Sequence, residues 1–213
     1  MARSGVHLVS TDEKTGIQAL ERKHPTRPMI EGQVELREFE YTRHGTQALI
    51  ASFSVASGKI IASSVGPTRT EDDFAGHIEA VIATDPKAGW IFVVDQLNTH
   101  KSEALVRLVA RHCGIEAELG LKGKSGILES MPSRAQFLSW ERHRIRFVYT
   151  PKHTAWLNQI EIWFSILVRK LLRRGSFRST EELKARIEAF ILYFNRTMAR
   201  AFKWTYKGRP LQA

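Results

Sequence analysis

The sequence predicts an α/β protein with a mixed β-sheet flanked by helices, and three observations support this prediction. The first third of the chain holds four segments rich in β-branched and aromatic residues, at 6–11, 38–43, 48–55 and 60–65. The remainder alternates short apolar runs, typical of buried strands, with segments of helical apolar spacing. The 213 residues, 43% of them hydrophobic, suit one domain with a sizeable core.

The four early segments predict an antiparallel meander. The first strand, 6–11, places Asp12 at its C-terminal end, and residues 12–16 then form a turn. Two prolines make residues 22–35 a loop. Gly45 and Gly58 separate the later strands as hairpin turns.

Helical and strand patterns alternate after the meander. Thr70 is the expected N-cap of a helix that ends near Thr84. Residues 90–94 predict a central strand buried on both faces, with Asp95 at its C-terminal end. A second amphipathic helix is expected over residues 102–112.

Residues 118–144 interrupt this alternation with a basic, glycine-rich loop and a short helix over 133–140. After a strand at 145–149, a helix is expected from about 155 to 174, with Thr154 as its N-cap. Ser179 and Glu182 form a capping-box pattern that begins the last helix, and 201–213 form a basic, irregular tail. This element order is that of a ribonuclease H-like fold, with residues 1–213 as a single domain.

Charge is unevenly distributed along the chain. Residues 1–106 contain 11 Lys and Arg against 14 Asp and Glu, whereas residues 107–213 contain 21 against 8. The basic half favours a polyanionic partner, with general solubility as the alternative. The sequence has no apolar run long enough for a bilayer, no apolar signal core and only one cysteine, so we expect a cytoplasmic protein without a membrane partner.

Three acidic residues follow predicted strands. Asp12 and Asp95 end two strands, and Glu161 lies two turns into the helix after a third, among large apolar side chains. Converging carboxylates repel one another unless cations neutralise them, and all-oxygen ligands suit Mg²⁺ or Mn²⁺. Two such ions about 4 Å apart would serve phosphodiester cleavage, so nucleic acid is the expected substrate. The alternative for Glu161 is the polar edge of an amphipathic helix.

Two longer motifs make a resemblance specific. Val-Val-Asp95-Gln-Leu-Asn98-Thr-His100-Lys and Pro151-Lys-His153-Thr-Ala-Trp156-Leu-Asn158-Gln-Ile-Glu161-Ile-Trp163-Phe resemble the DDE transposases of bacterial insertion sequences, in the branch related to mariner elements. Further matching segments are Ser10-Thr-Asp12-Glu-Lys14, Leu-Arg-Arg-Gly175-Ser-Phe177, Tyr193-Phe-Asn195 and Phe202-x-Trp204. The similarity covers essentially the whole sequence.

The resemblance implies a ribonuclease H-like catalytic domain in which Asp12, Asp95 and Glu161 bind two Mg²⁺ or Mn²⁺ ions. It implies cleavage of DNA at the ends of a transposable element and joining of the freed 3′-hydroxyl to target DNA. The expected partners are the terminal inverted repeats, target DNA and a second copy of the chain on that DNA. The expected location is the bacterial cytoplasm, in association with the nucleoid.

Two features depart from the relatives. They carry a helix-turn-helix region before the first catalytic strand, where this sequence has almost nothing. In many of them the second and third acids also lie closer together than Asp95 and Glu161, which are 66 positions apart. Residues 118–144 account for the excess, as a loop facing DNA or a partner, or as a solvated excursion. A non-catalytic DNA-binding remnant and a general ribonuclease H-like nuclease are therefore the alternative functions.

Asn158, His100 and His153 are further candidates, for orienting substrate. Asn158 lies one turn before Glu161 on the same helical face, with a plain surface position as the alternative. The alternative for His100 is a backbone hydrogen bond in its loop, and for His153 a capping or loop role. Glu13 is left out of the triad, because neighbouring side chains in a strand point to opposite faces.

Basic residues are densest directly after the third acid, and the glycine-rich loop adds two lysines. We expect these side chains to contact DNA phosphates, with a solvated helix face as the alternative. They are Lys122, Lys124, Arg169, Lys170, Arg173, Arg174 and Arg178.

Overall fold

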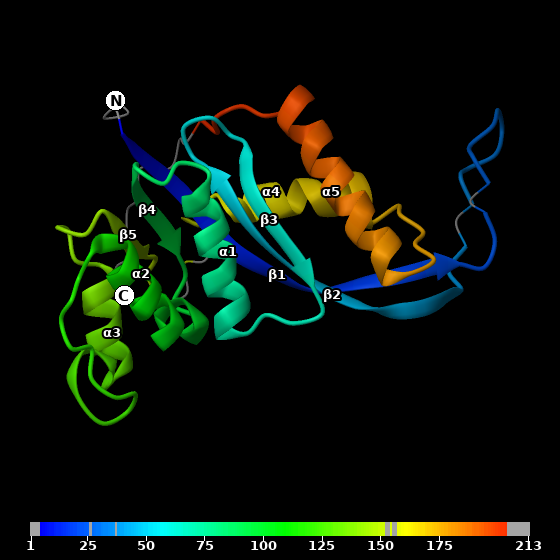
Figure 1. Ribbon diagram of the computed structural model, residues 1–213. Helices are drawn as coiled ribbons and strands as arrows, with labels where there is room; N and C mark the ends of the chain where they lie inside the picture. The colour runs from blue at the N-terminus through cyan, green and yellow to red at the C-terminus, as the bar shows by residue number, and fades with distance from the viewer. Residues whose placement is uncertain (1–4, 26, 37, 152–153, 155–156, 204–213) are drawn as a thin grey trace, which may run out of the picture.

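One mixed sheet of five strands organises the molecule (Figure 1). The computed structural model describes residues 5–25, 27–36, 38–151, 154 and 157–203. The strands are β1 (Val6–Arg22), β2 (Tyr41–Ser54), β3 (Ile60–Gly66), β4 (Gly89–Val94) and β5 (Ile145–Tyr149). Their order is β3-β2-β1-β4-β5, in which β1 to β3 are antiparallel, β4 is parallel to β1, and β5 is parallel to β4. This sheet confirms the predicted ribonuclease H-like α/β architecture.

Helices cover both faces of the sheet (Figure 1). They are α1 (Glu71–Ala83), η1 (Asn98–Lys101), α2 (Glu103–Cys113), η2 (Gly126–Leu128), α3 (Met131–Leu138), α4 (Ile160–Leu167), the π-helical turn η4 (Val168–Leu172) and α5 (Thr180–Thr197). None of the helices in the described ranges is long and apolar enough to cross a bilayer.

Two separate cores result, one on each face. Ile50 in β2 packs with α1, α2 and α3, whereas its neighbours Leu49 and Ala51 pack with α4 and α5. Alternation along a strand sends neighbouring side chains to opposite faces, so the sheet divides the two cores. We call the two sides the α1 face and the α4 face.

The first strand is much longer than predicted. Asp12 lies inside β1, which continues to Arg22, so the expected turn over residues 12–16 is wrong. Gly16 adopts a φ of +67° at a register shift between Lys14 and Ile17. The glycine therefore permits a β-bulge within a continuous strand, where the sequence suggested a turn.

The second and third predicted strands are a single strand, β2, and the hairpin turn expected at Gly45 is wrong. Gly45, with a φ of +137°, lies within β2 opposite the register shift between Gln18 and Leu20. The predicted loop at 22–35 begins where β1 ends, and isolated bridges such as Arg27 with Leu36 join the described residues between β1 and β2 to one another.

The helix that carries Glu161 begins later than predicted. It starts at Ile160 with Gln159 as its N-cap, and the hydroxyl of Thr154 donates to the Pro151 carbonyl instead of capping a helix. Residues 155 and 156 lie outside the described ranges. Glu161 is consequently in the first turn of α4, and the prediction of two preceding turns is wrong.

The other helix boundaries agree closely with the sequence. Thr70 caps α1 through a capping box with Asp73, and Ser102 caps α2. Ser179 caps α5, although the carboxylate of Glu182 accepts from the Arg178 N–H, one residue before the cap.

Strand β4 lies between β1 and β5, as expected for a central strand, but only one of its faces is fully buried. Trp90, Phe92 and Val94 are at most 1% exposed on the α1 face, whereas Ile91 and Val93 are partly exposed. Within the long 118–144 segment, Leu128 and Leu138 are buried in the core of the α1 face, so part of this segment belongs to the packed structure.

Candidate active site

The three predicted acids come from three different parts of the fold. Asp12 in β1 is 5% exposed, Asp95 directly follows β4, and Glu161 is the second residue of α4. Burial raises the pKa of both Asp12 and Glu161, and the negative charge of Asp95 adds to the rise in each. Asp95 is therefore near enough to act electrostatically on both of the other carboxylates.

A buried clamp fixes the start of α4 against β1. The hydroxyl of Ser10 donates to Oδ1 of Asn158 and accepts from the backbone N–H of Ile160 at 3.0 Å. Nδ2 of Asn158 donates to the Thr11 carbonyl at 3.0 Å and to Oδ2 of Asp12 at 3.2 Å. Ser10 thus caps α4 from the strand that carries Asp12, because the N-cap residue itself provides no side-chain bond.

This clamp decides the role of Asn158. Its side chain is completely buried, and its oxygen and both N–H groups have partners within the protein. No donor of its amide remains for a substrate, so the amide positions Asp12 and the first turn of α4.

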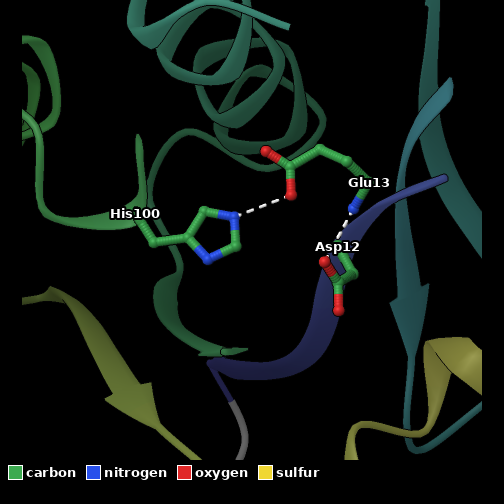
Figure 2. Close-up of side chains that lie close together, drawn as sticks. All are labelled: Asp12, Glu13 and His100. Carbon is green, nitrogen blue, oxygen red and sulfur yellow. Dashed lines mark hydrogen bonds and ion pairs between the residues drawn. The ribbon is translucent and has the colours of Figure 1, made fainter. Parts of the chain in front are cut away.

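A second network holds Asp95 through His100, and Figure 2 shows the contact of that histidine with Glu13. The ring of His100 lies between two carboxylates, with Nδ1 2.8 Å from Oδ1 of Asp95 and Nε2 2.9 Å from Oε2 of Glu13. The Phe74 ring packs on the imidazole at 4.3 Å, and the Tyr149 hydroxyl donates to the His100 carbonyl. His100 is fully buried, so it orients Asp95 and does not reach a substrate.

The pKa values follow from these surroundings. Burial raises the pKa of Asp12 to about 7, against the hydrogen bond from the Glu13 N–H. The hydrogen bond with His100 lowers the pKa of Asp95. Burial also raises the pKa of Glu161, while the nearby Lys14 ammonium lowers it. Burial alone would lower the pKa of His100, but its bonds with Asp95 and Glu13 outweigh burial and raise it to about 9.

Comparison with known proteins identifies the family. The family model described as DDE superfamily endonuclease matches residues 7–184. This chain belongs to the DDE superfamily endonucleases. No curated protein matches the chain.

Solved structures of the Mos1 mariner transposase show limited similarity to this chain. The Mos1 paired end complex with Mn has 14% identity and a TM-score of 0.35, and the match covers 90% of this chain and 56% of that one. The Mos1 strand transfer complex has 13% identity and a TM-score of 0.35, and the match covers 88% of this chain and 52% of that one. The endonuclease chain therefore spans little more than half the length of these proteins.

The donor set of this chain fits a hard divalent cation. One oxygen each of Asp12 and Glu13 and one ring nitrogen of His100 lie within 4.8 Å of one another. Both His100 nitrogens face carboxylate oxygens and donate to them as an imidazolium, which has no lone pair for a metal. The carboxylates of Asp12, Asp95 and Glu161 offer oxygen atoms, the kind of donor that Mg²⁺ and Mn²⁺ prefer.

Sequence reasoning missed two residues of the site. Asp12 and Glu13 do leave β1 in different directions, as alternation predicts, but Glu13 is placed to bind His100 (Figure 2). Ser10 lies two positions before Asp12, so both point to the α4 face, and this spacing was the available signal. No local sequence pattern could predict the contact between Glu13 and His100, because the two residues are 87 positions apart.

The remaining predicted residues are dispersed. His153 lies outside the described residues. Lys122 pairs with Glu71 at 3.1 Å, and Lys124 is exposed in the neighbouring turn. The other basic residues lie on η4 and the turn after it, with exposed side chains; they are Arg169, Lys170, Arg173, Arg174 and Arg178.

Proposed function

We propose that this chain is the catalytic core of a DNA transposase, which cuts DNA strands and joins the cut ends to target DNA with divalent metal ions. The observation that carries the proposal is the Ser10–Asn158 clamp, which fixes Asp12 in β1 against the first turn of α4, the turn that contains Glu161. Membership of the DDE superfamily endonucleases supports phosphodiester chemistry. The basic second half of the chain supports a nucleic-acid substrate.

Asp12, Asp95 and Glu161 would hold two Mg²⁺ or Mn²⁺ ions. When bound, such ions supply charge stabilisation for the attacking and leaving oxygens. The protein's own part is to keep the carboxylates in place, through the clamp on Asp12 and α4 and through His100 on Asp95. Strand cleavage adds water across a P–O bond and leaves a 3′-hydroxyl, and strand transfer then exchanges one P–O bond for another. Terminal inverted repeats, a target duplex and a second copy of the chain are the partners that this activity requires.

The test is nicking of a labelled nonspecific duplex with Mg²⁺ or Mn²⁺ by the wild type and Glu161→Gln. The substitution removes a ligand charge and keeps the side-chain shape, so nicking should fall by at least about 100-fold. Glu188→Gln, at an exposed position on α5, makes the same chemical change away from the site and should nick like the wild type.

Undiminished nicking by Glu161→Gln would refute the assignment. Absence of nicking in the wild type, with salt-sensitive DNA binding retained, would favour a non-catalytic DNA-binding remnant. Preferential cleavage of RNA–DNA hybrids would favour a general ribonuclease H-like nuclease.

A further inference from the structure

A groove of about 410 Å³ lies at the far end of β1, between two segments distant in sequence. One wall consists of residues 21–25, at the end of β1, and the other of residues 174–178, after η4. We call it the distal groove. The basic side chains that line it are Arg22, Lys23, His24, Arg174 and Arg178.

The two walls are fastened together, so the groove is formed in advance. The Phe177 N–H donates to the Leu20 carbonyl at 2.8 Å, and the Arg22 N–H donates to the Ser176 hydroxyl at 3.0 Å. Phe177 is 2% exposed and packs in the core of the α4 face. A Cβ on Gly175 would lie 2.2 Å from the Phe177 ring, so the glycine allows this close return of the chain.

The excess of positive charge in the groove comes from its arginines, because Lys23 pairs with Glu40 at 2.7 Å and His24 lies 4.0 Å from Glu38. Glu21 is its single acidic lining residue among those described, and its carboxylate is 2.8 Å from His44 and 3.8 Å from Arg178. Within the described part of the chain, no acidic side chain lies within ion-pair distance of Arg174. Solvent exposure alone would not require a fixed cleft here. A narrow cleft lined by cations does suit the phosphate backbone of DNA.

The distance from the catalytic carboxylates is set by β1 itself. Arg22 follows Asp12 by ten positions in the same strand, which at ~3.3 Å per residue places them ~30 Å apart. This is close to one turn of B-form DNA, about 34 Å. Both places belong to the α4 face, because α4 begins beside Asp12 and η4 leads to residues 174–178 (Figure 1).

We propose that the distal groove binds backbone phosphates of duplex DNA about one helical turn away from the phosphate at the catalytic carboxylates. The inference rests on the proposed function and adds a second, spaced contact on the same duplex. Arg174 and Arg178 contact the phosphates. Arg22 has a structural role, because its guanidinium donates to the carbonyls of Glu38 and Arg173.

The test compares hairpin-closed duplexes with stems of about 6 and about 20 base pairs, which span ~20 Å and ~70 Å. Only the longer stem reaches both places at once. For the wild type, kcat/KM for metal-dependent nicking should be about tenfold higher on the long stem. Arg174→Gln/Arg178→Gln should lose this preference, because its kcat/KM should fall much more on the long stem than on the short one.

The matched control is Lys87→Gln/Arg142→Gln, which removes two exposed positive charges near the starts of β4 and β5. This variant should keep the length preference. An unchanged length preference in Arg174→Gln/Arg178→Gln, or an equal loss on both stems, would overturn the proposal.

Salt dependence of binding keeps the inference testable if the wild type does not nick, a result that would count against the proposed function. On the long stem, the slope of log K against log salt should fall in magnitude by about 2 in Arg174→Gln/Arg178→Gln, and not in the control. Equal slopes for the two variants would refute phosphate binding by the distal groove and would leave the proposed function untouched.

Discussion

Removal of the Asn158 side chain tests how the catalytic carboxylates are held. Asn158→Ala deletes three buried hydrogen bonds and leaves the Ser10 hydroxyl and the Thr11 carbonyl without their amide partner. Each such loss costs ~1 kcal/mol or more, so the free energy of unfolding should fall by about 3 kcal/mol. Ser10→Ala should cost about 2 kcal/mol, because it removes the same bond and the cap on the Ile160 N–H.

The two substitutions should not add. The Ser10–Asn158 bond is lost in each single variant and can be lost only once in the double variant, so the cycle should show coupling of about 1 kcal/mol. Urea unfolding of the four proteins, at equal m-values, measures this coupling.

A stability effect alone would not show positioning, so a second measurement is needed. Groups that orient metal ligands typically change metal affinity by 10–100-fold when removed, and Mn²⁺ binding to folded Asn158→Ala should weaken by at least about tenfold. Asn195→Ala is the matched control. The side chain of Asn195 makes two hydrogen bonds, both to backbone groups of Ile60 and neither to a carboxylate. In Asn195→Ala, the free energy of unfolding should fall by about 2 kcal/mol and the Mn²⁺ affinity should stay at the wild-type value.

Either of two results would refute this reasoning. Additive free energies would mean that Ser10 and Asn158 do not act through each other. Equal Mn²⁺ affinities for Asn158→Ala and Asn195→Ala would mean that the clamp supports the fold without setting the positions of Asp12 and Glu161.

Two further predictions concern stability. Burial lowers the pKa of His77 to about 3, so the folded state excludes a proton that the unfolded state binds below pH ~6.5. The free energy of unfolding should therefore fall by up to ~1.4 kcal/mol per pH unit as the pH is lowered from 6.5 to 3. In acid titrations of unfolding, His77→Gln should show a shallower fall. Gly58→Ala should destabilise by at least ~2 kcal/mol in thermal unfolding, because its φ is +71° and its Cβ would lie 2.0 Å from the Arg200 carbonyl oxygen, whereas Gly123→Ala, at a φ of +74° with open space, should cost only about 1 kcal/mol. A His77→Gln profile parallel to the wild type, or equal costs for the two glycines, would contradict these accounts.

Local patterns predicted most of the elements, because their signals lie within a few residues. Thr70 and Ser102 cap helices whose apolar spacing begins directly after them. The apolar run before Asp95 identified β4 and placed this carboxylate at its end. The positions of Gly16 and Gly45 were also correct as interruptions, but a glycine with positive φ serves a turn and a bulge equally well. Only the pairing of β1 with β2 decides between them.

The interior of the site was less predictable, because its contacts join distant parts of the chain. The helical pattern around Glu161 suggested a start near Thr154, but the cap comes from Ser10, 150 residues before Ile160. Likewise, alternation gave the direction of Glu13 correctly and could not reveal that a buried histidine lay there. Asp12 and Asp95 were selected as predicted strand ends and Glu161 as an acid in the following helix, whereas the groups that contact Asp12 and Asp95 appeared only in three dimensions.

The division of the interior into two cores has a consequence for local unfolding. Helices α1 and α2 lie on one face and α4 and α5 on the other, so each layer can open as its own exchange unit. The carboxylates depend on both layers, since His100 and Glu13 belong to the α1 face and the Ser10–Asn158 clamp to the α4 face. A ligand that needs all three carboxylates therefore stabilises both layers together. Amide protons in α1 and α5, on opposite sides of the sheet, would then gain protection in step as that ligand is titrated.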